Sequence, residues 1–178
     1  MTRIAPVPPN EAVGALAETY EAIAQTLGRV PNMAQVMGAQ PIYLDMYMMM
    51  RRLLSEGRLD PLAREAIAIT VARENDCDYC LAAHSSAAVG LFGADPDEVT
   101  AWMSGQSADA ALGARLSFAR RLLETRGAVA AEDLDAIRAT GASDADIIEI
   151  LGVVVMNIAT NYFNRLADTD IDFPVPTK

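Results

Sequence analysis

Apolar residues recur every three or four positions along almost the whole chain, and the strict alternation of a half-buried strand is nearly absent. This spacing gathers the apolar side chains on one face of a helix, so it predicts helices that pack by that face. Gly, Pro and capping residues divide the pattern into the segments 10–28, 31–41, 42–57, 59–75, 76–90, 95–105, 109–127, 130–141 and 143–168. In the first segment we expect Asn10 as the N-cap and Val13 on the apolar face. We therefore predict an all-α fold with an extended tail from residue 169.

The length and composition fit one domain. The chain has 178 residues, of which 52% are hydrophobic, and this is enough for one sizeable core. We predict a single domain over residues 1–178. Within it, the core helix pair spans about residues 42–92 and a C-terminal helical unit spans about residues 109–168.

Two segments of the chain resemble each other. Residues 60–67 and 144–151 both place a Glu five residues after a capping Asp and continue into an apolar helix. At this offset, Cys80 aligns with Asn164. The similarity suggests a two-unit pseudo-repeat, although two amphipathic helices can also share such a pattern by chance.

The charge of the chain restricts its partners. The net charge is -10, which repels phosphate backbones and anionic lipid surfaces and argues against nucleic-acid or membrane binding. The N-terminal "MTRIAPVPPN" lacks the apolar run of a signal peptide. The most apolar stretch contains Glu149 and Asn157, and we expect it to be too short and too polar to cross a bilayer. We therefore expect a cytoplasmic protein.

The only two cysteines and the only histidine lie within eight positions, as Cys77, Cys80 and His84. A structural disulfide is rare in a reducing compartment, so catalytic or metal-binding roles are favoured. Attachment of haem needs a histidine directly after the second cysteine, where this chain has Leu81. Structural zinc needs four ligands, and the cluster offers three. We predict no metal; two inert buried thiols remain an alternative.

A redox site is the interpretation that the helix geometry favours. If a helix begins near Asp76, both thiols lie in its first turn, where unpaired N–H groups and the helix dipole stabilise a thiolate. His84 follows Cys80 by four residues and therefore shares its helix face, where it can act as a base. Cys77 is close enough to convert an oxidised Cys80 sulfur into a disulfide.

Glu65 is an acidic residue in an apolar stripe. It shares a helix face with Leu62, Ile69 and Ala72. A buried carboxylate needs a partner. His84 would supply one and form a proton relay, but an arginine from the same or another helix is an equal alternative.

These residues resemble a known family. The pattern is a Glu, eleven residues, C-x-x-C, three residues and a His, within "REAIAITVARENDCDYCLAAHSSAA". It resembles the alkylhydroperoxidase D-like (AhpD-like) group of the carboxymuconolactone decarboxylase superfamily over about residues 42–92. The end "NYFNRLADTDIDFP" is similar to the C-terminus of the peroxidase-related branch of that group.

The resemblance implies an all-helical, homo-oligomeric enzyme, often a trimer or hexamer, that reduces hydroperoxides through a dithiol. Cys80 would be the peroxidatic cysteine and Cys77 the resolving one. Glu65 and His84 would form the proton relay, and an external dithiol or protein electron donor would reduce the disulfide. No haem, flavin, metal or other cofactor is required.

The chain departs from the family pattern at Tyr79, where the best-known members carry a second histidine. Tyrosine is a poor base near neutral pH, so peroxidase activity could be weak, and we favour a packing role for this ring. Three other functions stay open. They are a cysteine-independent lyase of the carboxymuconolactone decarboxylase type, a disulfide reductase that does not act on peroxides, and a non-enzymatic helical assembly protein.

Overall fold

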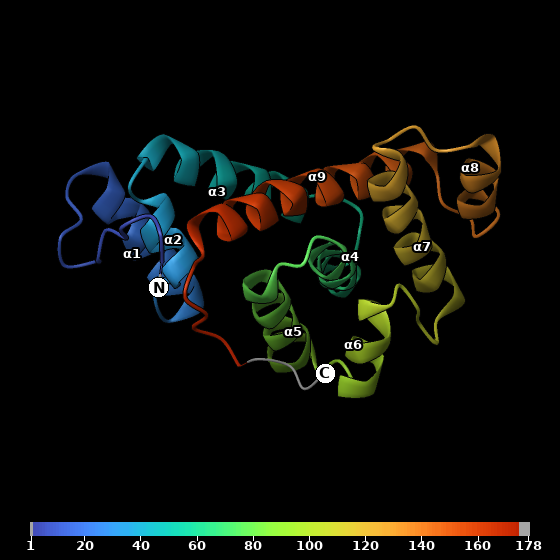
Figure 1. Cartoon of the computed structure of the whole chain (residues 1–178). Coiled ribbons are helices and arrows are strands. Elements are labelled where there is room, and N and C mark those ends of the chain that lie inside the picture. Colours follow the sequence, from blue (N-terminus) through green and yellow to red (C-terminus); the bar gives the residue numbers. More distant parts are fainter. Residues whose placement is uncertain (1, 175–178) are drawn as a thin grey trace.

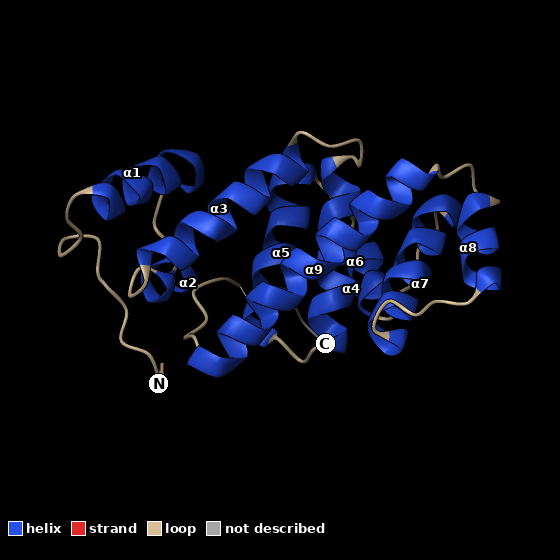
Figure 2. Ribbon diagram, turned by 90° about the horizontal axis from the view of Figure 1, so that it is seen from above, coloured by secondary structure: helices blue, strands red, loops and turns tan. Residues whose placement is uncertain are grey.

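The computed structural model describes residues 2–174, which form nine helices and no strand (Figures 1 and 2). The prediction of an all-α fold is confirmed. In chain order the helices are α1 (Ala15–Leu27), α2 (Asn32–Met37), α3 (Pro41–Ser55), α4 (Pro61–Glu74), α5 (Asp78–Phe92), α6 (Pro96–Met103), α7 (Ala110–Thr125), α8 (Ala131–Arg138) and α9 (Asp144–Ala167).

Helix α4 lies at the centre of the fold, where it contacts α5, α6, α7 and α9 (Figure 1). Over residues 63–72 only Arg64 and Glu65 are partly exposed, so the helix has no continuous solvent face. Asp60 caps this helix by accepting a hydrogen bond from the Ala63 N–H. The protein is therefore built around a helix that carries one of the predicted site residues.

Helix α9 runs across the molecule beside α3 and also contacts α4, α5 and α7 (Figure 1). An 18-residue window of this 24-residue helix has a mean hydropathy of 1.4. By length and composition alone, α9 could cross a membrane. The expectation that this stretch is too short and too polar to do so was therefore wrong in both length and polarity. The core helix of a folded domain passes the same test, and α9 packs against four other helices.

The N-terminal helix begins later than predicted. The sequence places its N-cap at Asn10, but α1 starts at Ala15, after Gly14 with a φ of 57°. The preceding residues form a turn in which the Glu11 N–H donates to the Pro8 carbonyl. Val13, which was expected on the apolar face, is 80% exposed.

The segment after α9 returns to the N-terminal helices. Over residues 169–174 it is not helical, in agreement with the predicted extended tail. The rest of the predicted tail, residues 175–178, lies outside the described residues. Asp172 pairs with Arg29 and accepts a hydrogen bond from the Asn32 N–H at 3.0 Å. Phe173 meets the Tyr79 ring edge-on at 5.7 Å between centroids. This segment thereby joins α2 to α5.

Candidate redox site

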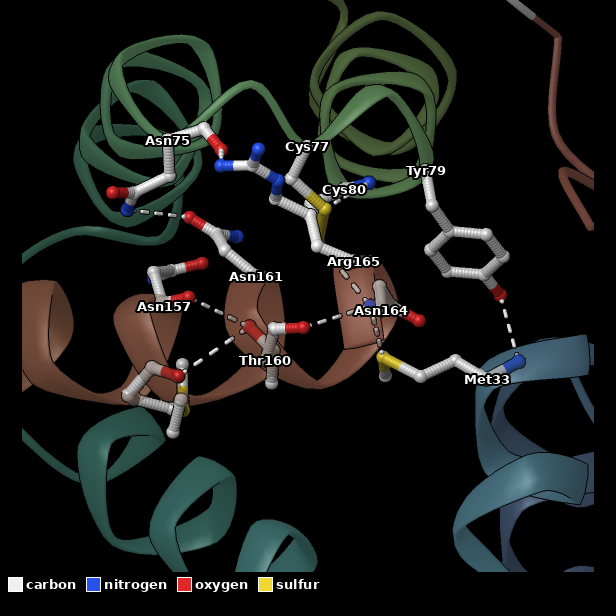
Figure 3. The surroundings of a disulfide bond; sticks show 12 residues. Met33, Asn75, Cys77, Tyr79, Cys80, Asn157, Thr160, Asn161, Asn164 and Arg165 are labelled. Atoms are coloured by element: carbon white, nitrogen blue, oxygen red, sulfur yellow. Dashed lines mark hydrogen bonds between the residues drawn. A yellow bond between two sulfur atoms is a disulfide. The ribbon is translucent and has the colours of Figure 1, made fainter. Parts of the chain in front are cut away.

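Cys77 and Cys80 form a disulfide at the start of α5, with their Cα atoms 5.4 Å apart (Figure 3). The helix begins at Asp78, two residues later than predicted, so Cys77 is its N-cap and Cys80 lies in its first turn. The Cys77 sulfur accepts a hydrogen bond from the Cys80 N–H at 3.3 Å. Both sulfurs therefore lie where the helix offers unpaired N–H groups.

The turn between α4 and α5 fixes this position. Asp76 adopts a φ of 51°, which aspartate tolerates better than most residues. The chain then reverses, and the Cys77 N–H donates to the Ala72 carbonyl at 2.9 Å. Arg165 of α9 donates to the Asn75 carbonyl at 2.7 Å. Helix α9 thus holds the turn that carries the cysteines.

Asn164 is a site residue that the sequence reasoning did not assign. Its Nδ2 lies 3.3 Å from the Cys80 sulfur, 3.1 Å from the Met33 sulfur and 3.0 Å from the Thr160 carbonyl oxygen (Figure 3). The side chain is buried, with 3% exposure. Among the described residues, Asn164 Nδ2 is the one side-chain N–H donor within hydrogen-bond distance of a cysteine sulfur. Such a donor favours the thiolate form of that cysteine over the thiol.

Its neighbour Asn161 has a different contact. Asn161 Oδ1 accepts a hydrogen bond from Asn75 Nδ2 at 3.0 Å (Figure 3). This bond ties α9 to the end of α4 and does not reach a sulfur. The pair Asn161 and Asn164 therefore offers two buried asparagines on one helix, of which one contacts Cys80.

Glu65 pairs with His84 and not with an arginine. His84 Nδ1 and Glu65 Oε2 are 2.7 Å apart, and the two side chains are partly buried. A carboxylate at Nδ1 favours the tautomer with its proton on that nitrogen, which leaves Nε2 as an acceptor. The structure thus resolves the choice that spacing alone left open.

A cavity of about 260 Å³ joins these groups. Cys80, Glu65 and His84 all line it, together with mostly apolar side chains of α3, α5 and α9. Among the described residues no hydrogen bond links His84 directly to Cys80. Cys77 does not line this cavity; it borders a separate hollow. Three of the four predicted residues, Cys80, Glu65 and His84, therefore face one cavity. Cys77 is bonded to Cys80 but faces the other hollow.

Tyr79 is held in the protein interior. Its hydroxyl oxygen accepts a hydrogen bond from the Met33 N–H at 3.1 Å (Figure 3), and its ring packs against Phe173. Burial raises the pKa of Tyr79 well above its ordinary value, and the nearby Asp172 carboxylate adds to this shift. A tyrosine so fixed stays protonated at neutral pH, which fits the packing role.

Comparisons with known proteins agree with this architecture. Residues 41–125 match the carboxymuconolactone decarboxylase family model. A peroxidase-related protein from Ralstonia eutropha JMP134 with an alkylhydroperoxidase AhpD core has a TM-score of 0.87 at 18% identity, over 96% of this chain and 92% of that chain. A peroxidase-related protein from Silicibacter sp. TM1040 has a TM-score of 0.81 at 27% identity, over 96% and 94%.

The fold is also that of the debrominase Bmp8, whose apo structure has a TM-score of 0.81 at 22% identity, over 97% of this chain and 93% of that chain. No curated protein sequence matches the chain significantly. The fold and the site together define a helical protein with a dithiol motif. The match over residues 41–125 and the shared fold make the chain similar to the carboxymuconolactone decarboxylase family and to peroxidase-related proteins with an AhpD core.

Proposed function

We propose that the protein is a thiol-dependent oxidoreductase that reduces an organic hydroperoxide through Cys77 and Cys80. One observation carries the proposal: the Cys80 sulfur and the Glu65–His84 pair line the same largely apolar cavity. The helix N-terminus and Asn164 Nδ2 favour a thiolate at Cys80. A reactive sulfur, a proton carrier and an apolar pocket are what reduction of an organic peroxide requires.

The cycle has three steps. The Cys80 thiolate attacks the outer peroxide oxygen, the O–O bond breaks, and the departing alkoxide takes a proton from His84, directly or through a water. The products are an alcohol and a Cys80 sulfenic acid. The Cys77 thiol then condenses with the sulfenic acid, which releases water and forms the disulfide. Two external thiols reduce that disulfide and are themselves oxidised.

Glu65 has a positioning role in this scheme. Its carboxylate oxygen lies 2.7 Å from Nδ1 of His84, which orients the ring and leaves Nε2 to receive and return a proton. The pair can therefore collect the proton released when Cys80 becomes a thiolate and return it to the alkoxide. The required proton transfer takes place inside the cavity.

The direct test is the intact mass of the reduced protein after brief exposure to an equimolar amount of cumene hydroperoxide, followed by thiol alkylation. We expect a loss of two hydrogens and no alkylation until a dithiol is added. Cys77→Ser should trap a sulfenic acid that reacts with dimedone, and Cys80→Ser should remain unoxidised. Two freely alkylated thiols in the treated wild-type protein would refute the proposal.

A second candidate is reductive removal of a halogen from a small ring. The Bmp8 relative is a debrominase, solved as its C82A variant with 2,3,4-tribromopyrrole, and the cavity here is largely apolar and of a size for one small ring. In this reaction the carbon–bromine bond breaks, two thiols form a disulfide, and the ring gains hydrogen while HBr is released. Bromide release from tribromopyrrole by the reduced protein tests this candidate.

The lyase alternative is separated by the same variants. A decarboxylase-type reaction that does not use the cysteines would survive in a Cys77→Ser/Cys80→Ser protein supplied with a lactone acid. Loss of all activity in that double variant would instead agree with dithiol chemistry.

We also propose that the protein is a homo-oligomer. Two exposed apolar stripes support this, and their members recur at helical spacing on α3 (Ile42, Met46, Met49, Leu53) and α9 (Ile148, Leu151, Val155, Tyr162, Leu166). Light scattering coupled to size-exclusion chromatography tests the proposal, and a monomer at micromolar concentration would contradict it.

A further inference from the structure

The disulfide borders two separate hollows. Cys80 lines the largely apolar cavity with Glu65 and His84, whereas Cys77 lines a polar hollow formed by the α4–α5 turn, the end of α9 and the segment that follows it. Tyr79 is the one residue that both hollows share. Its ring is buried and held by Met33 and Phe173, so it separates the two sides.

We infer that the reducing thiol reaches Cys77 through the polar hollow, and that this hollow selects a thiol donor carrying positive charge close to its sulfur. The inference rests on the proposed dithiol function. It adds a second binding site with its own ligand chemistry, distinct from the cavity that receives the oxidant.

The charges beside Cys77 favour a cation. Asp76 and Asp78 flank this cysteine, are exposed, and have no ion-pair or side-chain hydrogen-bond partner among the described residues. Four aspartates line the hollow and outnumber its two arginines, Arg3 and Arg165. Of these arginines, Arg3 lies 3.8 Å from the Asp168 carboxylate, whereas Arg165 donates to the backbone carbonyl of Asn75. A cationic group that enters the hollow is therefore attracted, and an anionic one is repelled.

Two buried polar atoms point to a ligand independently of these charges. Asn164 Oδ1 and Thr169 Oγ1 are buried without a hydrogen-bond partner in the part of the chain that the structure describes. Asn164 is 3% exposed and Thr169 is 7% exposed, and both residues line the hollow. The amide oxygen of Asn164 accepts hydrogen bonds, and the hydroxyl of Thr169 can accept as well as donate, so both atoms suit an ammonium or amide N–H of the incoming molecule.

The chemistry on this side is a balanced exchange. The donor thiolate attacks the Cys77 sulfur, the S–S bond breaks, and Cys80 leaves as a thiolate that Asn164 Nδ2 stabilises at 3.3 Å. A second donor thiol then attacks the donor sulfur of the mixed disulfide and releases Cys77. Two electrons pass to the protein, and the donor becomes a disulfide. A good leaving group at Cys80 makes attack on Cys77 the faster route.

The test follows reduction of the disulfide form without any peroxide, by timed alkylation and mass. The probes are cysteamine, which is cationic, and 3-mercaptopropionate, which is anionic and of similar size, each rate being expressed per thiolate. At low salt we expect cysteamine to react about tenfold faster, and this ratio should fall as salt screens the charges. Equal rates for the two thiols at low salt would overturn the inference.

The decisive variant is Asp76→Asn/Asp78→Asn. Asparagine tolerates the positive φ of Asp76, so the turn is preserved. We expect the rate ratio to fall about fivefold, because each removed carboxylate weakens the attraction and the repulsion together. A general change in the disulfide would alter both rates equally and leave the ratio as it was, and that result would overturn the inference.

A matched control removes two carboxylates elsewhere. Glu132→Gln/Asp135→Asn changes the net charge equally on α8, at the far end of the molecule, and should keep the parent ratio (Figure 1). A fall in the ratio of this control equal to that of the Asp76/Asp78 variant would overturn the inference. Charge-selective reduction in a protein that hydroperoxides do not oxidise would refute the proposed peroxidase function while supporting this donor site.

Discussion

Removal of Asn164 should raise the pKa of the Cys80 thiol. In the disulfide form, its Nδ2 lies 3.3 Å from the Cys80 sulfur, inside the protein and away from competing water. A hydrogen bond to a charged group contributes about 1.5–3 kcal/mol, and a shift of one pKa unit corresponds to about 1.4 kcal/mol. Because Nδ2 is shared with the Met33 sulfur and the Thr160 carbonyl, we take the lower end of this range.

Asn164→Ala should therefore raise the pKa of Cys80 by about one unit. The measurement is the rate of alkylation by iodoacetamide across pH, in a Cys77→Ser background that leaves one thiol. Where the pH lies below both pKa values, the rate of reaction with cumene hydroperoxide should fall by up to about tenfold, since fewer molecules carry the thiolate.

Asn161→Ala is the matched control, because its side chain bonds Asn75 and does not reach a sulfur. It should lower the free energy of unfolding while leaving the pKa of Cys80 at its parent value. A pKa that is unchanged by Asn164→Ala, or raised equally by Asn161→Ala, would refute the reasoning that the N–H···S contact stabilises the thiolate.

Three further predictions concern the relay, the buried tyrosine and the tail. His84→Ala should slow hydroperoxide reduction about 100-fold, and Glu65→Gln/His84→Ala should be no slower than His84→Ala in stopped-flow assays, because the two groups act as a unit. Burial raises the pKa of Tyr79, so the folded protein retains that proton above about pH 10 and its free energy of unfolding declines there. Tyr79→Phe should keep peroxidase activity and make that decline shallower in urea titrations; an unchanged slope would contradict the assignment. Asp172→Ala should lower the free energy of unfolding by about 1 kcal/mol through loss of its pair with Arg29, which a lower melting temperature would show.

Much of the fold follows from local patterns, and the failures have local causes. Asp60 and Pro61 mark the start of α4, where capping chemistry determines the boundary. Residue type predicts Asn10 as the N-cap of the first helix, but the chain turns at Pro8–Glu11, and α1 begins only after Gly14. A capping residue type therefore predicts a helix start only where no competing turn precedes it.

The sequence alone predicted the part of the site that lies within one pair of consecutive helices. Cys77, Cys80 and His84 are linked by helical spacing, and the structure retains that arrangement. Spacing places Glu65 on a face but does not name its partner, so its pairing with His84 needed the packing of α4 against α5. Asn164 was missed because its contact with Cys80 joins positions 84 residues apart, and an asparagine within a helix carries no signal of its own. The predicted pseudo-repeat, which aligns these two residues, stays a prediction.

The alanines of the central helix have a consequence for how the sequence can vary. Ala63, Ala66, Ala68 and Ala72 are all buried where α4 meets its neighbours. A larger side chain at any of them would push a whole helix aside, with a typical penalty of about 1–3 kcal/mol. A saturation mutagenesis survey should therefore find α4 the least permissive segment and the exposed face of α8 among the most permissive. Natural divergence of this lineage should accumulate at the periphery while the small residues around the redox site persist.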